Sequence, residues 1–382
     1  MKISWQLIYI ILYFYRTSIT VIADIYLSRI TTLGDNQTYI LGGDFASDLS
    51  GESSVLSLTV LIDAPRKFAT QLTLALGYYL NSYFGMALII NLFFQTIAFI
   101  GIIAVLKALE PQHRKWVLFL LVMPSFTIWS SIAGKEAIVV FAVGIVTAYL
   151  IKITKKNKLP NIKELLSAIL LLIFKAQYLP AFLFIYFTVI LGNKIHQKSF
   201  IILLAGLMSL SFLYIERDRL NDITLIFIPK NFVNLTHKTL VYSGDDGLAG
   251  GRSTREVFWK EKGDYIWKSP KGMIMALVGP TYKEALLNNN KLHLLGFLEG
   301  MLILIFLMIF VLYHSKNASA VLFIAVIFTL FWILFASYPF GVMNPGTAIR
   351  YRTGIIPFIG VLAVYFLSQN IHEKWLKKNR IK

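Results

Sequence analysis

Runs of apolar residues long enough to cross a membrane as helices recur from one end of this chain to the other. Spanning the hydrocarbon core of a bilayer takes roughly 20 apolar residues, and the backbone there must satisfy its own hydrogen bonds. Hydrophobic residues make up 57% of the sequence, and the apolar runs continue to Leu367 with no linker rich in Pro, Gly or Ser. The sequence therefore predicts an all-α, polytopic integral membrane protein, with residues 1–382 in a single transmembrane domain.

The individual runs predict about ten membrane-spanning helices. Two runs leave alternatives open. Residues 68–84, broken by Asn81, could lie in the membrane interface, and residues 164–191, interrupted at 175–180, could form a tight hairpin or a re-entrant pair. A further pair of spans rises from Trp116 and returns after a turn at 124–136. The remaining spans are expected at Gln6–Leu27, Met86–Leu106, Ser199–Ile215, His293–Leu312, Ala318–Tyr338 and Gly354–Leu367.

Lysine and arginine gather in short clusters between the apolar runs, although the formal net charge is +17. Such clusters are a topology signal, because short loops rich in Lys and Arg stay in the cytoplasm. The clusters at 107–115, 152–158 and 374–382 therefore predict that both termini are cytoplasmic. This distribution does not indicate a nucleic-acid-binding surface, and we expect no nucleic acid partner.

A long connection separates the run that ends at Ile215 from the run that begins at His293. About 75 residues are too many for an ordinary turn between helices. The connection carries Trp259, Trp267 and the apolar run Met273–Val278, which favour helices in the membrane interface. We predict a long extracytoplasmic loop at 216–291 that contains short helices.

The sequence predicts no soluble cofactor and no metal site, while leaving a metal requirement open. It contains no cysteine, and its six histidines form no His-Glu-x-x-His pattern. Thiol catalysis and thiolate metal ligation are therefore excluded, and metal hydrolysis has no support.

Asp35 is the first candidate catalytic residue, and Tyr39 is a candidate substrate-binding residue beside it. Both lie in the segment Gly34–Tyr39, just beyond the first apolar run. A carboxylate there could act as a general base toward a sugar hydroxyl, or orient an acceptor or metal. The alternative is an ordinary polar loop with an Asp-Asn turn.

Lys135 and Glu136 are further candidate catalytic residues at the start of an apolar run, and Lys175 and Tyr178 are candidate binding residues in the interrupted pair. Ionisable residues at membrane depth are costly unless they are solvated, paired or facing a cavity. Lys135 and Glu136 could hold a lipid-linked phosphate or brace a neighbouring acid. Alternatively, both side chains extend to the headgroups, and Lys175 lies near the outer turn of its hairpin.

Four arginines are candidate phosphate ligands. Arg350 and Arg352 stand just before the last apolar run, where the positive-inside rule disfavours them. Their planar donor forks suit the oxygens of a diphosphate leaving group. Arg252 and Arg255 follow two glycines in the long loop, but this segment lacks the Gly-Lys-Ser/Thr ending of a nucleotide-binding loop.

The layout resembles polytopic bacterial glycosyltransferases of the GT-C type, including O-antigen and exopolysaccharide polymerases of the Wzy kind. The resemblance extends over most of the chain and lies in the arrangement of spans and loops more than in strict sequence motifs. It rests on Asp35 with Tyr39 in the first outer loop, the hairpin Pro124–Glu136, the large loop Ser211–Lys291, and Arg350 and Arg352 followed by Pro357.

The resemblance implies sugar transfer from, or onto, glycans linked to polyprenyl phosphate at the periplasmic face of the bacterial inner membrane. It would make Asp35 the catalytic or acceptor-orienting acid and would have the arginines hold lipid phosphate. The expected function is polymerisation of O-antigen, capsule or exopolysaccharide repeat units. Expected partners are a polyprenyl-(di)phosphate-linked glycan, membrane lipids and other polysaccharide-assembly proteins.

Other functions remain open from the sequence. One is a single-sugar transferase that uses a polyprenyl-phosphate sugar donor, and another is a flippase or transporter of a lipid-linked oligosaccharide. A noncatalytic assembly protein or an acyltransferase is a third class, although no histidine-based acyl-transfer site is evident. The candidate residues gather on the outer side, which favours an extracytoplasmic catalytic site over a path through the bilayer.

Overall fold

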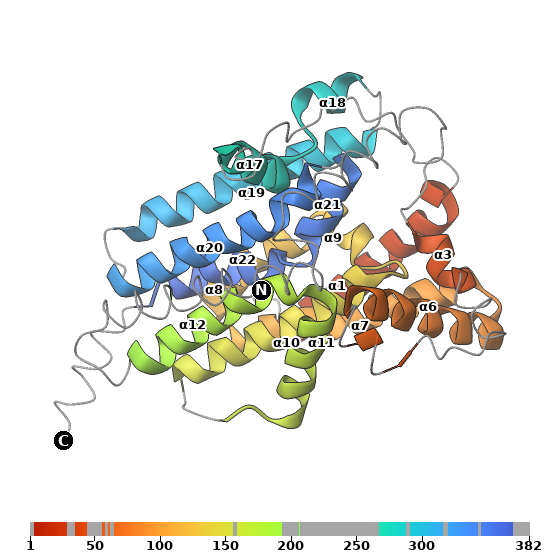
Figure 1. Cartoon of the computed structure of the whole chain (residues 1–382), viewed down its shortest axis with the longest axis horizontal. Helices are drawn as coiled ribbons and strands as arrows, with labels where there is room; N and C mark the ends of the chain where they lie inside the picture. Colours follow the sequence, from red (N-terminus) through yellow and green to blue (C-terminus); the bar gives the residue numbers. More distant parts are fainter. Residues whose placement is uncertain are drawn as a thin grey trace.

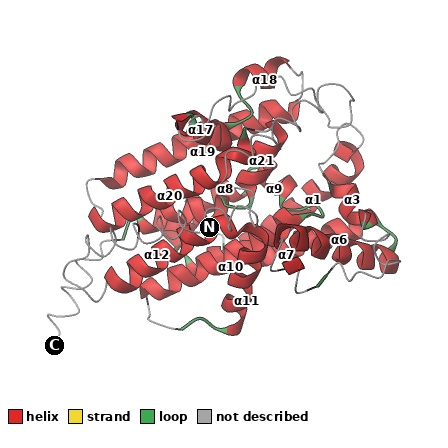
Figure 2. Ribbon diagram, viewed as in Figure 1, coloured by secondary structure: helices red, strands yellow, loops and turns green. Residues whose placement is uncertain are grey.

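The computed structural model describes residues 4–28, 35–43, 56–57, 60–61, 65–155, 159–192, 206, 267–287, 291–315, 320–342 and 345–369. Every regular element in these ranges is helical (Figure 2). The part of the predicted loop at 216–266 and the predicted span Ser199–Ile215, apart from Gly206, lie outside the described residues.

Six helical runs within the described part of the chain are long and apolar enough to cross a membrane. A seventh is possible if α21 (Pro345–Thr353) and the following helix Ile356–Phe366, bent by 60° relative to each other, count as one span. These helices support a polytopic membrane protein, and a total of about ten spans remains a prediction. The six runs are Trp5–Leu27, Ala87–Ala108, Lys135–Lys155, Ile162–Ile190, Lys291–His314 and Leu322–Gly341.

Helices α7 (Ala87–Ala108) and α10 (Lys135–Lys155) form the centre of the bundle and run parallel. Asn91 contacts Ala133 just before α10 begins, and Lys155 at the other end donates to the carbonyl of Ala108. A Cβ on Gly144 of α10 would lie 2.4 Å from the Gly101 carbonyl oxygen of α7. Glycine is therefore needed here to let the two backbones approach, as at many helix pairs in membranes.

The chain returns between these parallel helices through α8 (Pro111–Leu121) and α9 (Pro124–Trp129). The sequence predicted a span from Trp116 that ends at a turn beginning with Pro124; the structure ends α8 at Leu121 and adds the short helix α9 within the predicted turn. Pro124 lacks a backbone N–H and suits the first turn of a new helix. Trp116 and Phe119 pack against aromatic rings of α19 (Lys291–Ser315).

The predicted interruption at Lys175 is present. Helix α11 (Ile162–Lys175) ends there in a non-helical conformation, with φ −150° and ψ 56°, and a 3-10 turn leads into α12 (Leu179–Gly192). Glu164 in α11 pairs with Lys152 at 3.0 Å, and Tyr186 in α12 stacks on Tyr149. Both arms therefore meet the C-terminal half of α10, so the chain reverses direction near Lys175.

Two smaller groups of helices cover the bundle (Figure 1). Helix α3 (Asn36–Leu41) packs against α6 (Pro65–Phe84), which is not among the candidate spans. Helix α17 (Ser269–Val278) packs against α19 and α20 (Ala320–Gly341), and α18 (Tyr282–Leu287) packs against α19. These last two short helices fall within the range predicted for the long loop.

The described ends of the chain lie at the same end of the bundle. The Arg114 guanidinium at the start of α8 lies over the ring of Trp5, and His113 contacts the hydroxyl of Ser368. Lys155 is also at this end. The N-terminus of α10, and with it Glu136, is at the opposite end.

Candidate functional site

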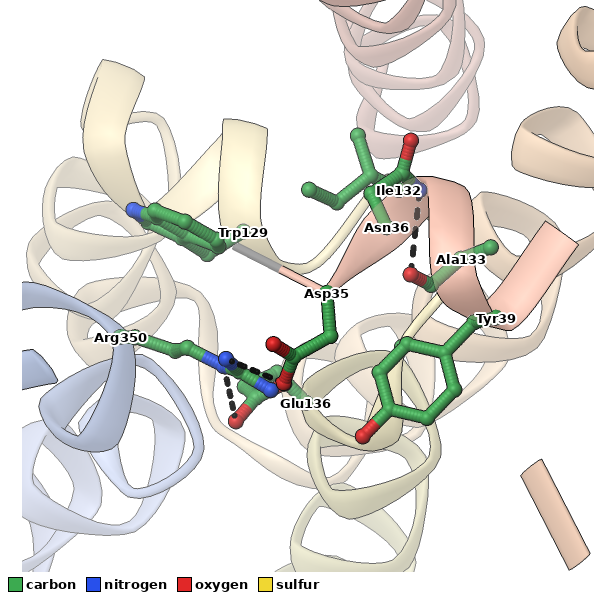
Figure 3. Close-up of a pocket in the computed structure, with 9 residues that line it drawn as sticks. Asp35, Asn36, Tyr39, Trp129, Ile132, Ala133, Glu136 and Arg350 are labelled. Atoms are coloured by element: carbon green, nitrogen blue, oxygen red, sulfur yellow. Dashed lines mark hydrogen bonds and ion pairs between the residues drawn. The ribbon is translucent and has the colours of Figure 1, made fainter. Parts of the chain in front are cut away.

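Arg350 joins three separate parts of the chain at the end of the bundle that holds Glu136. Its Nη1 atom lies 3.0 Å from Oδ2 of Asp35, and its Nε atom lies 2.9 Å from Oε1 of Glu136. Figure 3 shows the guanidinium between the two carboxylates, with Arg350 coming from α21, Asp35 from the residue before α3, and Glu136 from the first turn of α10. Residues 315 positions apart therefore form one charged group.

The two carboxylates have different environments. The Glu136 side chain is 5% exposed and that of Arg350 is 16% exposed, whereas that of Asp35 is 57% exposed. A buried charge needs a partner, while an exposed carboxylate can be solvated by water. Glu136 is therefore the fixed counter-ion of Arg350, and Asp35 is the accessible one.

A shallow hollow with a cavity volume of about 10 Å³, roughly the space of one water molecule, adjoins this charged group. The rings of Tyr39 and Trp129 lie on either side of it in Figure 3, and the Arg350 Cζ atom is 6.0 Å from the Trp129 ring centre. Charged, amide, aromatic and apolar groups thus meet in one hollow. The lining residues are Asp35, Asn36, Tyr39, Trp129, Ile132, Ala133, Gly134, Glu136 and Arg350.

A hydrogen-bond network holds α3 against the bundle. The Asn36 amide donates to Oδ1 of Asn91 at 3.0 Å and to the carbonyl of Ala133 at 3.1 Å. Asn91 in turn donates to Asp24, in the π-helical turn Ala23–Leu27 that ends the first span. Because Asn36 follows Asp35 directly, this network holds the backbone of Asp35 next to Arg350.

Tyr39 is a neutral hydrogen-bonding group beside the charges. Its side chain is 2% exposed, and this burial raises the pKa of Tyr39 well above its ordinary value, although the nearby Arg350 charge acts in the opposite direction. The phenol therefore keeps its proton at neutral pH and suits a hydroxyl-bearing ligand better than a role as a base.

Lys135 and Lys175 lie near the pocket without lining it. Lys135 donates to the Thr70 hydroxyl at 3.0 Å, and the Lys175 ammonium is 3.6 Å from the centre of the Tyr351 ring. Both cations act electrostatically on Glu136, together with Arg350. Three cations against the carboxylates Asp35 and Glu136 leave one net positive charge, which favours an anionic ligand.

Arg352 lies apart from the pocket, although it is only two residues from Arg350. It is 2% exposed, and its donors reach the backbone carbonyls of Leu277, Val278, Gly279 and Gly296. It therefore ties the C-terminal end of α17 and the helix α19 to α21. This position explains Arg352 as a structural residue and gives no support to its predicted contact with phosphate.

The other predicted binding residues are not brought into the pocket. Tyr178, in the 3-10 turn after Lys175, is fully buried and does not line it. Arg252 and Arg255 lie outside the described residues.

Sequence reasoning assigned no role to Trp129 or Asn36, which line the pocket, or to Asn91, which positions Asn36. Asn91 had a usable signal, because a buried amide inside an apolar run needs hydrogen-bond partners. Trp129 ends α9, immediately before the polar pair Ser130 and Ser131.

The arrangement places a guanidinium, a group that can bind anions, beside an accessible carboxylate, a group that can act on a hydroxyl, and the two are paired with each other. Within the described ranges, no group of three or more His, Asp or Glu side chains could hold a metal ion. No protein-family model matches this sequence, and no curated protein or solved structure matches it.

Proposed function

We propose that this chain is a membrane glycosyltransferase that acts on glycans linked to polyprenyl phosphate and polymerises the repeat units of an O-antigen, capsule or exopolysaccharide. The observation that carries the proposal is Arg350, held between the buried Glu136 and the accessible Asp35 at one end of a polytopic helical bundle. A phosphate-binding cation and an exposed carboxylate are the two groups that such a transfer needs side by side.

In the proposed reaction, a hydroxyl of the acceptor glycan attacks the anomeric carbon of the donor glycan. A new carbon–oxygen bond forms as the bond between the anomeric carbon and the phosphate oxygen breaks. Asp35 takes the hydroxyl proton as general base, and the electron pair remains on the departing lipid diphosphate. Arg350 stabilises the charge that grows there, and Glu136 holds Arg350 in place. No nucleotide sugar or soluble cofactor takes part.

The pocket walls suit a carbohydrate. Trp129 is partly exposed and offers an aromatic surface that can pack against the apolar face of a sugar ring, while the buried Tyr39 phenol and the Asn36 amide are neutral polar groups in the wall. We propose that these residues orient the reacting sugars, which makes Trp129 and Tyr39 substrate-binding residues beside the charged group.

The charge distribution supports a site on the extracytoplasmic face of a bacterial inner membrane. Arg114 and Lys155 lie at the end of the bundle opposite Glu136, and both described ends of the chain are there too. If that end is cytoplasmic, as the positive-inside rule favours, the pocket faces outward and both termini are cytoplasmic.

The test is the length of glycan chains on the lipid carrier in cells that lack this protein, measured by gel electrophoresis and mass spectrometry. The cells are complemented with wild type, Asp35→Asn, Arg350→Gln or the control Glu110→Gln. Glu110 is a 43% exposed carboxylate paired with Lys155 at 3.8 Å, at the end opposite the pocket. We expect single complete repeat units to accumulate unless wild type or the control is present. Full-length chains with both pocket variants would refute the proposal, and units short by one sugar would indicate a single-sugar transferase.

One observation favours a flippase or transporter of lipid-linked oligosaccharide as a second candidate. Arg16 is fully buried midway along the first span and donates to Ser130 and Ser131, but its Nε and Nη1 atoms have no hydrogen-bond partner among the described residues. Buried cations in spans often mark a path for an anionic substrate. Complete units trapped on the cytoplasmic face, with transport lost in Arg16→Gln but not in Asp35→Asn, would support this function.

A further inference from the structure

The ion pair between Asp35 and Arg350 occupies the two groups that the proposed reaction needs. The Arg350 Nη1 atom, which would contact a phosphate, contacts the Asp35 carboxylate at 3.0 Å. In turn, the guanidinium contacts an oxygen of the Asp35 carboxylate, the group that would take the proton from the hydroxyl of the acceptor glycan. In this arrangement neither group is available until the pair opens.

Only one of the two carboxylates around Arg350 can leave at low cost. Moving Glu136 away would leave a buried carboxylate without its main partner, beside Lys135 and Lys175, which also act on it. Asp35 is 57% exposed, so water can replace Arg350 around its oxygens. Exposed ion pairs are weak, and breaking one leaves no buried charge behind.

The backbone around Asp35 does not lock its carboxylate in place. Asp35 stands at the N-cap position of α3, yet its side chain makes no capping hydrogen bond to that helix. The Asn36 network holds the backbone of this segment, while Arg350 is the partner of the Asp35 side chain in the described part of the chain. The carboxylate can therefore rotate away while α3 stays in position.

A phosphate group is a stronger partner for Arg350 than Asp35 is. It offers several oxygens and a charge that, for a monoester, exceeds that of one carboxylate, and the guanidinium fork matches its geometry. The one net positive charge of the surrounding cluster adds to this preference.

We infer that Asp35 is an exchangeable counter-ion: the phosphate group of a polyprenyl-phosphate ligand displaces Asp35 from Arg350 and thereby frees the carboxylate to act on the acceptor hydroxyl. This inference rests on the proposed function, which it deepens by setting an order of events. The phosphate-bearing donor binds first, and the base becomes available only in its presence. The ion pair thus keeps the Asp35 carboxylate from acting as a base before the donor phosphate binds.

Binding of farnesyl phosphate to the purified full-length protein in nanodiscs of phosphatidylcholine tests this exchange. Asp35→Asn removes the competitor, so we expect affinity to rise two- to five-fold, the size of an exposed ion pair. Arg350→Gln should lose binding. Glu110→Gln adds the same net charge at the far end of the bundle and should leave affinity unchanged. An affinity for Asp35→Asn that is equal to or weaker than wild type would overturn the exchange.

Farnesol and inorganic phosphate separate the two parts of the probe. If the phosphate group is what displaces Asp35, inorganic phosphate should compete with farnesyl phosphate and farnesol should not. Competition by farnesol alone would place the binding energy in the lipid chain and would count against the inference.

A second measurement uses the wild-type protein and does not depend on how any variant folds. Carbodiimide labelling of Asp35, quantified by mass spectrometry of peptides, should increase when farnesyl phosphate is added, because the carboxylate loses its ion pair. Protection of Asp35 by the ligand, or no change at saturation, would overturn the inference.

Failure of the exchange is distinct from failure of the proposed function. Lost chain growth in Asp35→Asn cells with unchanged binding would reject only the exchange. Enhanced binding with normal chain growth in both Asp35→Asn and Arg350→Gln cells would reject the proposed glycosyltransferase.

Discussion

Removing the carboxylate of Glu136, which is buried beside Arg350, should destabilise the protein far more than removing that of Asp35, which is exposed. Breaking a buried ion pair by losing one partner costs about 3–5 kcal/mol, whereas an exposed pair contributes about 0–1 kcal/mol. Arg350 is 16% exposed, and after Glu136→Gln it would still be paired with Asp35. We therefore expect Glu136→Gln to lower the free energy of unfolding by about 3 kcal/mol, the lower limit of that range. Asp35→Asn should cost about 0.5 kcal/mol.

Equilibrium unfolding of the purified protein in lipid bicelles would measure both values. Glu110→Gln makes the same chemical change as Glu136→Gln at a 43% exposed carboxylate, so it should cost less than about 1 kcal/mol. The double variant Asp35→Asn with Glu136→Gln should cost more than the sum of the single changes, because it leaves Arg350 without either carboxylate. Equal costs for the two single variants would show that the difference in burial does not govern the site, and the reasoning would fail.

Three further predictions concern the packing and protonation of the bundle. Gly144→Val should lower the free energy of unfolding by about 1–3 kcal/mol in the same assay, because its Cβ would lie 2.4 Å from the Gly101 carbonyl oxygen. The control Gly206→Ala should not destabilise the protein, because its Cβ would lie 3.7 Å from the nearest atom. Arg352→Met should cost about 3 kcal/mol, because it removes a buried guanidinium that donates to four carbonyls, and wild-type stability would contradict its structural role. Burial raises the pKa of Tyr39 above its ordinary value of 10.0, so the folded state holds that proton more tightly than the unfolded state. Stability should fall as the pH rises above about 10, and Tyr39→Phe should lose less stability than wild type between about pH 9 and 11.

The fold was predictable where bilayer thickness sets the length of an element. The runs that became the first span, α7, α10, α19 and α20 are close to the predicted boundaries, because an uninterrupted apolar helix has to be about as long as the hydrocarbon core is thick. The break before Pro124 agrees with the turn predicted at 124–136, whereas the short helix α9 inside that turn was not predicted. Hydropathy averages over a window, so it does not register a six-residue helix between two apolar runs.

The site was predictable as separate residues but not as a contact. Asp35, Glu136 and Arg350 were each singled out because charges beside apolar runs need a reason, yet nothing in their spacing shows that 315 positions of chain bring Asp35 to Arg350. The expected joint phosphate contact of Arg350 and Arg352 stays a prediction. Residues two apart on an α-helix are separated by about 200° of rotation around the helix axis, so their side chains leave on nearly opposite sides. In the structure one reaches the pocket and the other reaches backbone carbonyls.

Ionic strength should separate the two ion pairs of Arg350, and this difference is what an exchangeable counter-ion requires. The Debye length falls from about 30 Å at 0.01 M salt to about 3 Å at 1 M, which screens exposed charges strongly and buried charges much less. Double-mutant cycles would measure the coupling energy of Arg350 with Asp35 and with Glu136 at both salt concentrations.

We expect the Asp35 coupling to approach zero at 1 M salt and the Glu136 coupling to remain, because their side chains are 57% and 5% exposed. Salt anions and a ligand phosphate both compete with Asp35 for Arg350. If salt weakens the ion pair between Asp35 and Arg350, a ligand phosphate can also open it. If both couplings fell together, Glu136 would be as accessible to ions as Asp35, Arg350 would have no fixed partner, and a phosphate could not select which carboxylate to release.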